Sequence, residues 1–115
     1  MKQSQVKQSR SEVNVIMPEI QCALSREGAR VFRNNVGLFT TIDGRKVRTG
    51  LCVGSADLIG WYKGRFLACE VKVPGKKPKP HQQNFLDQVN LSGGIGFYAT
   101  SAEESVDKLR EFGEG

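Results

Sequence analysis

Two carboxylates lie in a stretch of the chain that reads as a β-hairpin. Apolar, β-prone runs flank the dipeptide Lys63-Gly64, which predicts a two-residue turn between two antiparallel strands. Counting back from this turn along both strands brings Asp57 opposite Glu70 on one face, with Cβ atoms roughly 5 Å apart. A four-residue loop would keep this register and a three-residue loop would break it. The sequence therefore predicts a pair of facing carboxylates.

This pair requires a compensating positive charge, because like charges directly opposite each other destabilise a sheet. Mg²⁺ commonly takes one or two carboxylates together with water and phosphate oxygens. Lys72 lies two residues beyond Glu70 and so shares its face of the strand. One reading is therefore a site at which a metal ion activates water to attack a phosphodiester. The other is a structural cluster of ion pairs, and Asp57, Glu70 and Lys72 by themselves support both readings equally.

The composition limits what the rest of the chain can be. With 115 residues, 38% of them hydrophobic, the chain fits a single domain with one core. Its net charge of +5 and isoelectric point near 9.3 suggest an acidic partner, first of all nucleic acid, although a solvated basic surface would give the same numbers. Three scattered cysteines (Cys22, Cys52 and Cys69) and one histidine do not match a zinc site, and they fit free thiols in a reducing compartment. Because no leader or bilayer-spanning stretch is recognisable, we expect an intracellular, soluble protein.

Predicted helices flank the hairpin in the sequence. Pro18 and Pro80 at helix starts, and the capping pair Ser101 and Glu104, predict three amphipathic helices. The strand after the Lys63-Gly64 turn is apolar on both faces, which is typical of a central strand covered by helices. We therefore expect an α/β fold with a central mixed β-sheet flanked by helices.

Two further segments are expected to stand apart from this core. Residues 1–17 read as a polar N-terminal arm, in which the apolar run 13–17 is a candidate for dimer packing, and residues 18–115 form one domain. Residues 38–49 read as a second hairpin with the favoured Asp43-Gly44 turn. Basic side chains on this hairpin and on the proline-punctuated loop before Pro80 suit contact with phosphates, or serve only to keep exposed segments soluble. The candidates for nucleic-acid binding are Arg33, Arg45, Lys46, Arg48, Lys76, Lys77 and Lys79.

Short motifs follow one another along the chain in an order known from one nuclease superfamily. They are a helix with Glu19-Ile20-Gln21, a turn Arg33-Asn34-Asn35, the string Gly54-Ser55-Ala56-Asp57, the tripeptide Glu70-Val71-Lys72 and a helix that opens with Gln82. Over residues 19–109 this order resembles the PD-(D/E)xK superfamily and, within it, the small phage-type stand-alone members of the VRR-NUC family. The tripeptide alone is a weak motif, whereas its place after the other motifs is much more specific. Two departures are Ala56, where the superfamily has proline, and the absence of a Val-Arg-Arg string.

The resemblance implies a metal centre. Asp57, Glu70 and the Val71 carbonyl would bind Mg²⁺ or Mn²⁺. Glu19 would hold a metal-bound water or a second metal ion. Taken without the resemblance, Glu19 is explained by its favourable position at the positive end of a helix dipole.

The resemblance also implies roles around that centre. Lys72 would orient or activate the attacking water and stabilise the charge that develops on the phosphate. Gln82 would support Lys72 or contact DNA, and Gln83 would take its place if the helix began one residue later. Without the resemblance, a glutamine at a helix start reads as an ordinary exposed residue.

As a whole, the resemblance implies a restriction-endonuclease-like core and a metal-dependent, structure-specific DNA endonuclease similar to a Holliday junction resolvase. Such an enzyme would act as a homodimer on branched or structured DNA in the cytoplasm of a bacterial host, with a phage or prophage origin. Two alternatives stay open. One is a flap nuclease or exonuclease of the same superfamily, and the other is a non-catalytic DNA-binding module whose acidic cluster is structural.

Overall fold

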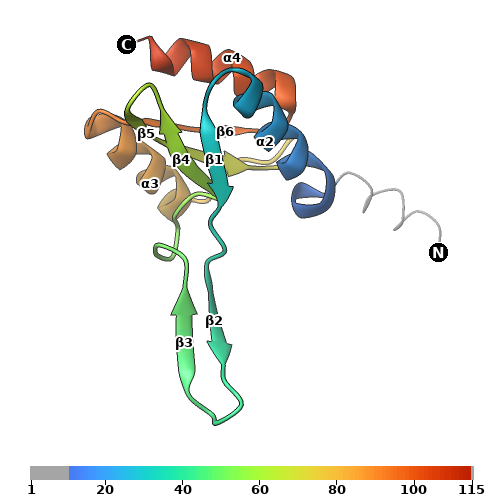
Figure 1. Cartoon of the computed structure of the whole chain (residues 1–115), viewed down its shortest axis with the longest axis vertical. Coiled ribbons are helices and arrows are strands. Elements are labelled where there is room, and N and C mark those ends of the chain that lie inside the picture. Colours follow the sequence, from blue (N-terminus) through green and yellow to red (C-terminus); the bar gives the residue numbers. More distant parts are fainter. Residues whose placement is uncertain (1–10, 115) are drawn as a thin grey trace, which may run out of the picture.

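A computed structural model describes residues 11–114 and shows a mixed α/β fold with a four-stranded sheet (Figure 1). The strands lie in the order β1 (Arg30–Arg33), β4 (Leu58–Tyr62), β5 (Arg65–Val71) and β6 (Ile95–Ala99). Three of them run antiparallel, and β6 pairs parallel to β5. The predicted mixed sheet flanked by helices is therefore confirmed.

The main core lies between one face of the sheet and the helices α2 (Met17–Arg26) and α4 (Ala102–Gly113). Its largest fully buried side chains come from both layers, as the helical and strand periodicities require. They include Ile20, Leu24, Leu58, Leu67, Ile95 and Leu109. Burying a side chain of this size stabilises the fold by roughly 1.5–3 kcal/mol, so this layer supplies most of the apolar stabilisation.

Helix α3 (Pro80–Leu91) covers the other face of the sheet, but only over β5 and β6. The alternation along β5 shows the two faces: Leu67 and Cys69 belong to the main core, while Ala68 packs with Leu86 of α3. This double cover explains why β5 is apolar on both sides. Within residues 11–114, no helix covers the same face of β1 and β4, and Phe32 and Trp61 remain exposed there.

The N-terminal part of the domain begins earlier than the sequence predicts. A π-helical turn, η1 (Glu12–Ile16), runs directly into α2, and Ser11 accepts a hydrogen bond from the Asn14 backbone at its start. Ile16 and Met17 are buried in the main core, so the boundary predicted between residues 17 and 18 falls inside a continuous helical segment. Because these two side chains are buried within their own chain, they offer no exposed apolar surface for the dimer packing predicted for residues 13–17. The first ten residues of that arm lie outside the described residues.

Strands β2 (Gly37–Thr40) and β3 (Lys46–Thr49) form a separate two-stranded ribbon that projects from the body of the molecule (Figure 1). The ribbon contains the predicted second hairpin, but its loop is longer than the predicted two-residue turn, because Thr40 pairs with Lys46. The Thr41 N–H donates to the Arg45 carbonyl at 2.8 Å and closes a three-residue loop over residues 42–44, in which Gly44, with φ of +89°, occupies the left-handed position.

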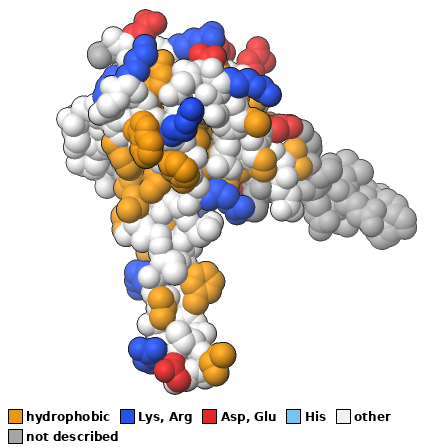
Figure 2. Space-filling view, viewed as in Figure 1, with side chains coloured by type: hydrophobic (Ala, Val, Ile, Leu, Met, Phe, Trp, Pro, Cys, Tyr) orange, Lys and Arg blue, Asp and Glu red, His pale blue; other side chains and the backbone are white. Residues whose placement is uncertain are grey.

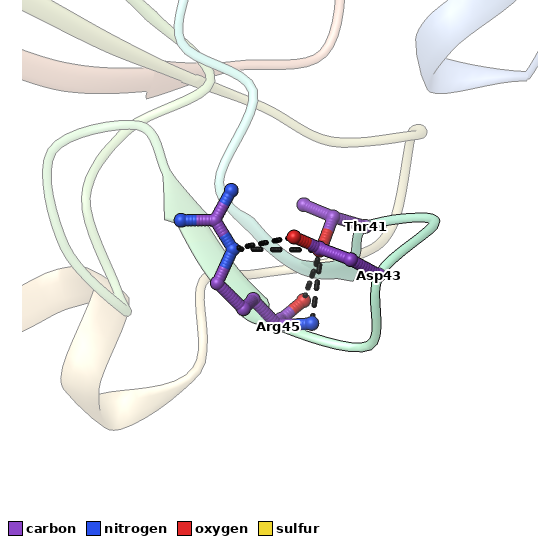
Figure 3. A network of polar contacts seen from close by, with 3 residues as sticks. All are labelled: Thr41, Asp43 and Arg45. Carbon is purple, nitrogen blue, oxygen red and sulfur yellow. Dashed lines mark hydrogen bonds and ion pairs between the residues drawn. The ribbon is translucent and has the colours of Figure 1, made fainter.

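Side chains in the ribbon loop hold this longer connection (Figure 3). The Thr41 hydroxyl donates to the Asp43 carboxylate and accepts a hydrogen bond from the Arg45 backbone N–H at 3.0 Å. Arg45 Nε lies 3.1 Å from Asp43 Oδ2. This net of polar contacts accounts for the one-residue shift from the predicted register.

Candidate active site

The β4–β5 hairpin has the predicted two-residue turn. Lys63 and Gly64 both have positive φ, 51° and 78°, which is the geometry of a type I′ turn. The strands pair from Tyr62 with Arg65 to Leu58 with Cys69. Asp57 and Glu70 each lie one step beyond the last of these pairs, so the register places them opposite each other as predicted.

The hairpin is anchored to the helices at its turn. The Arg65 guanidinium donates to the carbonyl of Gly113 at the end of α4, at 3.1 Å, and to the carbonyls of Gly93 and Gly94 after α3, at 2.9 and 3.0 Å. A cation at the carbonyl end of a helix is favourable because it satisfies carbonyls that have no helical partner. The turn end of the hairpin is therefore fixed to the ends of both helices.

Asp57 is held from two sides. The Val71 backbone N–H donates to Asp57 Oδ2 at 2.8 Å. Asn34, at the end of β1, donates its backbone N–H to the Asp57 carbonyl at 2.8 Å and its side-chain amide to Ser55 Oγ and the Ala56 carbonyl, also at 2.8 Å. Burial raises the pKa of Asp57, while the Val71 hydrogen bond and the Lys72 charge oppose the rise.

Glu70 is almost completely buried, with 2% of its surface exposed. Its Oε2 lies 3.4 Å from Lys72 Nζ, and the Lys72 side chain is itself only 12% exposed. Among the buried side-chain N and O atoms of residues 11–114, Glu70 Oε1 is the one without a hydrogen-bond partner. Burial, and then the charge of Asp57, raise the pKa of Glu70 to about 7 against the opposing Lys72. The structure thus brings together Asp57, Glu70 and Lys72, the three residues that the sequence places on one face.

The Val71 main chain lies between these groups. Because the N–H and C=O of one strand residue point to the same edge, and the Val71 N–H points at Asp57, its carbonyl is directed to that side as well. Two carboxylate groups and a carbonyl are oxygen ligands of the kind that Mg²⁺ and Mn²⁺ take. Within the part of the chain that the structure describes, no three His, Cys, Asp or Glu side chains gather closely enough to hold a metal ion by themselves.

Glu19 is not brought to this site. It is exposed on α2 and lines a different hollow, together with Cys22 and Ala102. Met17 lines the hollow that contains Asp57, and two residues turn an α-helix by about 200°, so Glu19 points the opposite way. The role predicted for Glu19, to hold a metal-bound water or a second metal ion, therefore does not fit its position on α2.

Another carboxylate, Glu12, approaches the site instead, and the sequence analysis missed it. Its Oε2 accepts a hydrogen bond from the Val73 backbone N–H at 3.3 Å, one residue after Lys72. The signal in the sequence is an acidic residue directly after the capping Ser11, at the start of a helical turn within the segment predicted to be an arm.

Gln82 faces the candidate site, as predicted. It lines a hollow of about 340 Å³ together with Asp57, Arg33 and Ser55. Helix α3 begins at Pro80 as expected, and Gln82 Oε1 accepts the Lys79 backbone N–H at 2.8 Å. The alternative, Gln83, instead donates its amide to the exposed Asp87 on the same helix. The helix geometry therefore favours Gln82 over Gln83 as the residue nearer the carboxylates.

The predicted basic residues divide into two groups. Arg33 lines the Asp57 hollow, and Lys76, Lys77 and Lys79 are exposed on the loop between Lys72 and α3. The other group lies on the ribbon: Arg45 pairs with Asp43, Lys46 donates to Thr40 Oγ1 at 3.0 Å, and Arg48 is exposed. Of these residues, Arg33 is the one that lines the hollow beside Asp57.

No helix within residues 11–114 is long and apolar enough to cross a membrane. No protein-family model matches the chain, and no curated protein matches its sequence.

Proposed function

We propose that this chain is a metal-dependent phosphodiesterase that cleaves branched DNA, similar to a Holliday junction resolvase. The observation that supports this most strongly is the state of Glu70. A buried carboxylate oxygen without a partner is costly, and a lysine that contacts only the other oxygen does not remove that cost. A divalent cation between Glu70 and Asp57 would satisfy it.

The donor set fits such an ion. Asp57, Glu70 and the Val71 carbonyl would hold Mg²⁺ or Mn²⁺, and Glu12, hydrogen-bonded to the Val73 N–H, is a further carboxylate that could order the surrounding water. When bound, the metal ion supplies Lewis-acid stabilisation of the charge that develops on the phosphate.

The remaining roles belong to side chains. Lys72, held beside Glu70, orients the attacking water and stabilises the negative charge of the transition state. Water adds to the phosphorus, one ester P–O bond breaks, and the leaving oxygen takes up a proton. Arg33 and Gln82 line the hollow beside Asp57, where they bind the phosphate backbone and hold the scissile group in position.

Branched DNA is the substrate because the basic residues are spread over two separated surfaces. The loop lysines follow Lys72 closely in the chain, while Lys46 and Arg48 lie on the ribbon, which projects from the body (Figure 1). Phosphate contacts of this kind recognise the shape of DNA rather than its sequence. Resolution of a four-way junction needs two symmetric cuts, which a two-fold homodimer would supply. For a phage-type enzyme, the place of action is the cytoplasm of a bacterial host.

The purely structural reading has one observation in its favour, the buried ion pair between Lys72 and Glu70. It predicts a DNA-binding module that neither binds Mn²⁺ nor cuts DNA. The nuclease reading predicts both.

A labelled panel of linear, flap, splayed and four-way DNA, incubated with Mg²⁺, with Mn²⁺ or with a chelator, tests the proposal. We expect metal-dependent cleavage that is strongest on the four-way junction. Better cleavage of flaps or free ends would indicate the related nuclease activities instead. DNA binding without cleavage under any metal condition would contradict the nuclease proposal.

A further inference from the structure

The β2–β3 ribbon has one apolar and one basic face. The register pairs Phe39 with Val47 on one face and Leu38 with Arg48 on the other, where Lys46 also lies. The Phe39 ring folds back over Gly37, so it lies along the ribbon. At the tip, the Ile42 side chain is completely exposed.

This ribbon lacks the support that a hairpin needs. A two-stranded hairpin alone is at best marginally stable in water, and this one pairs with no other strand in residues 11–114. Phe39 is 57% exposed, so the apolar face of the ribbon is uncovered. The ribbon therefore requires a partner surface.

The body of the molecule carries a second uncovered apolar surface, which we call the aromatic face and define by Phe32, Trp61 and Phe66. Phe32 and Trp61 have ring centroids 5.7 Å apart, and Trp61 pairs with Phe66 across the strands. The three side chains are between 42% and 54% exposed. Figure 2 shows apolar side chains gathered over β1 and β4 on this side of the body.

A hollow extends this face toward α3. Its volume is about 520 Å³, and it is lined by apolar side chains, including Phe66, Leu51, Phe85 and Val89. Contiguous exposed apolar surface of this kind marks an interaction site in soluble proteins. The ribbon of the same chain leaves it open, because the ribbon points away from the body (Figure 1).

We infer that two copies of this chain form a two-fold dimer by reciprocal ribbon exchange, in which the Phe39–Val47 face of each ribbon packs on the aromatic face of the partner. A two-fold arrangement covers all four surfaces with a single type of contact. This inference deepens the homodimer of the proposed function and moves its interface from residues 13–17 to the ribbon.

The available area is sufficient for such a dimer. A half-exposed aromatic side chain offers about 100 Å². Phe39 and the three rings of the aromatic face, with Val47 and Leu51, then offer roughly 1,100 Å² over the two copies, close to the 1,200 Å² at which stable interfaces begin.

A second copy fits these surfaces better than DNA does. Among the described residues, the paired positions on the Phe39–Val47 face carry no charge, and Arg30, which lies beside Trp61, donates to the Ala29 carbonyl at 2.8 Å and to Ser25 Oγ at 3.4 Å. With a net charge of +5 on each chain, association through charged faces would be repulsive. Ribbon exchange leaves Lys46 and Arg48 on the outer face of each ribbon, where they remain free to contact phosphates.

Sedimentation velocity on the full chain tests the dimer. We expect a dimer for the wild type and a monomer for two variants, Phe39→Ser with Val47→Ser on the ribbon and Trp61→Ser on the aromatic face. Leu91→Ser is the matched control, because Leu91 is an exposed apolar residue on α3 that lies on neither surface, and it should remain dimeric. Circular dichroism establishes that each variant is folded.

Cross-linking tests the exchange itself. In a background with Cys22→Ser and Cys52→Ser, one chain carries Val47→Cys and another carries Phe66→Cys. A short bismaleimide should join the two chains when they are mixed, and neither chain to itself. A wild-type monomer, or a dimer without this cross-link, would overturn the inference whatever the nuclease assay shows. A cross-linked dimer that cuts no DNA would reject the nuclease proposal alone.

Discussion

The two hairpins of this protein share a local design and differ in surroundings. Each ends its loop with a glycine at positive φ, Gly64 in β4–β5 and Gly44 in β2–β3. The first hairpin lies in the sheet between helices, with its turn fixed by Arg65. The second projects into solvent as a separate ribbon. Turn chemistry thus makes a hairpin, while the packing around it decides what its side chains can do.

The carboxylates show this difference directly. On the exposed ribbon, the Thr41 hydrogen bond and then the Arg45 contact lower the pKa of Asp43. In the buried hairpin, Glu70 also has a cation beside it, yet burial raises its pKa to about 7. Desolvation outweighs the ion pair there, and the site is left in need of further positive charge.

The largest expected effect comes from removing either buried carboxylate. Asp57→Asn and Glu70→Gln should lower the cleavage rate by roughly a thousandfold or more, because the metal ion and its several kcal/mol of charge stabilisation are lost together. Calorimetric titration should show Mn²⁺ binding to the wild type and none to either variant. The ribbon counterpart, Asp43→Asn, is the control and should bind Mn²⁺ normally. Unchanged Mn²⁺ binding by Asp57→Asn would rule out the site.

The next effect compares one cationic side chain from each hairpin, Lys72 beside the carboxylates and Arg45 on the ribbon. Lys72→Ala should keep Mn²⁺ affinity and lower kcat by roughly a hundredfold, because its ammonium acts on the water and on the transition-state charge. Arg45→Ala on the ribbon should leave kcat unchanged and weaken DNA binding, with a smaller salt dependence. If Lys72→Ala instead unfolded at moderate temperature, the structural ion-pair reading would gain support.

The third effect is on stability in the presence of a chelator. Glu70 has a pKa of about 7 in the folded state and an ordinary value of 4.5, so between these values the folded protein binds more protons than the unfolded chain. The free energy of unfolding should therefore fall as pH rises from 5 to 8, by up to about 3 kcal/mol. Denaturant titrations at several pH values measure this.

Two variants test whether Glu70 causes this pH dependence of the free energy of unfolding. Glu70→Gln should remove it, whereas Glu103→Gln, an exposed position on α4, should retain it. If the free energy of unfolding of the wild type, measured with a chelator present, instead rose over this pH range, it would contradict the claim that burial raises the pKa of Glu70.

The smallest effect compares the two turn glycines. Neither has an atom within 4 Å of an added Cβ, so Gly64→Ala and Gly44→Ala carry the same backbone strain of about 1 kcal/mol. Gly64→Ala should lower the melting temperature by about 4 °C and accelerate amide exchange across the sheet. Gly44→Ala should accelerate exchange only in β2 and β3. Equal exchange patterns for the two variants would mean that the ribbon is a cooperative part of the body.

Local sequence chemistry determined several features of this protein. The Lys63-Gly64 turn fixed the register that brings Asp57 opposite Glu70. Pro80 began α3, so that Gln82 rather than Gln83 faces the hollow. These predictions rest on interactions between residues close in sequence, which is why they can be made without knowledge of the whole fold.

Tertiary structure alone decided the rest. Which of the two carboxylates, Glu12 or Glu19, lies near the candidate site depends on which face of the helical segment packs against the sheet. Ile16 and Met17 are buried in the core, and this orientation brings Glu12 to the Val73 N–H. The unpartnered oxygen of Glu70 likewise follows from burial between layers. Such features depend on contacts between segments far apart in the chain, and a pattern read along the sequence carries spacing but not burial.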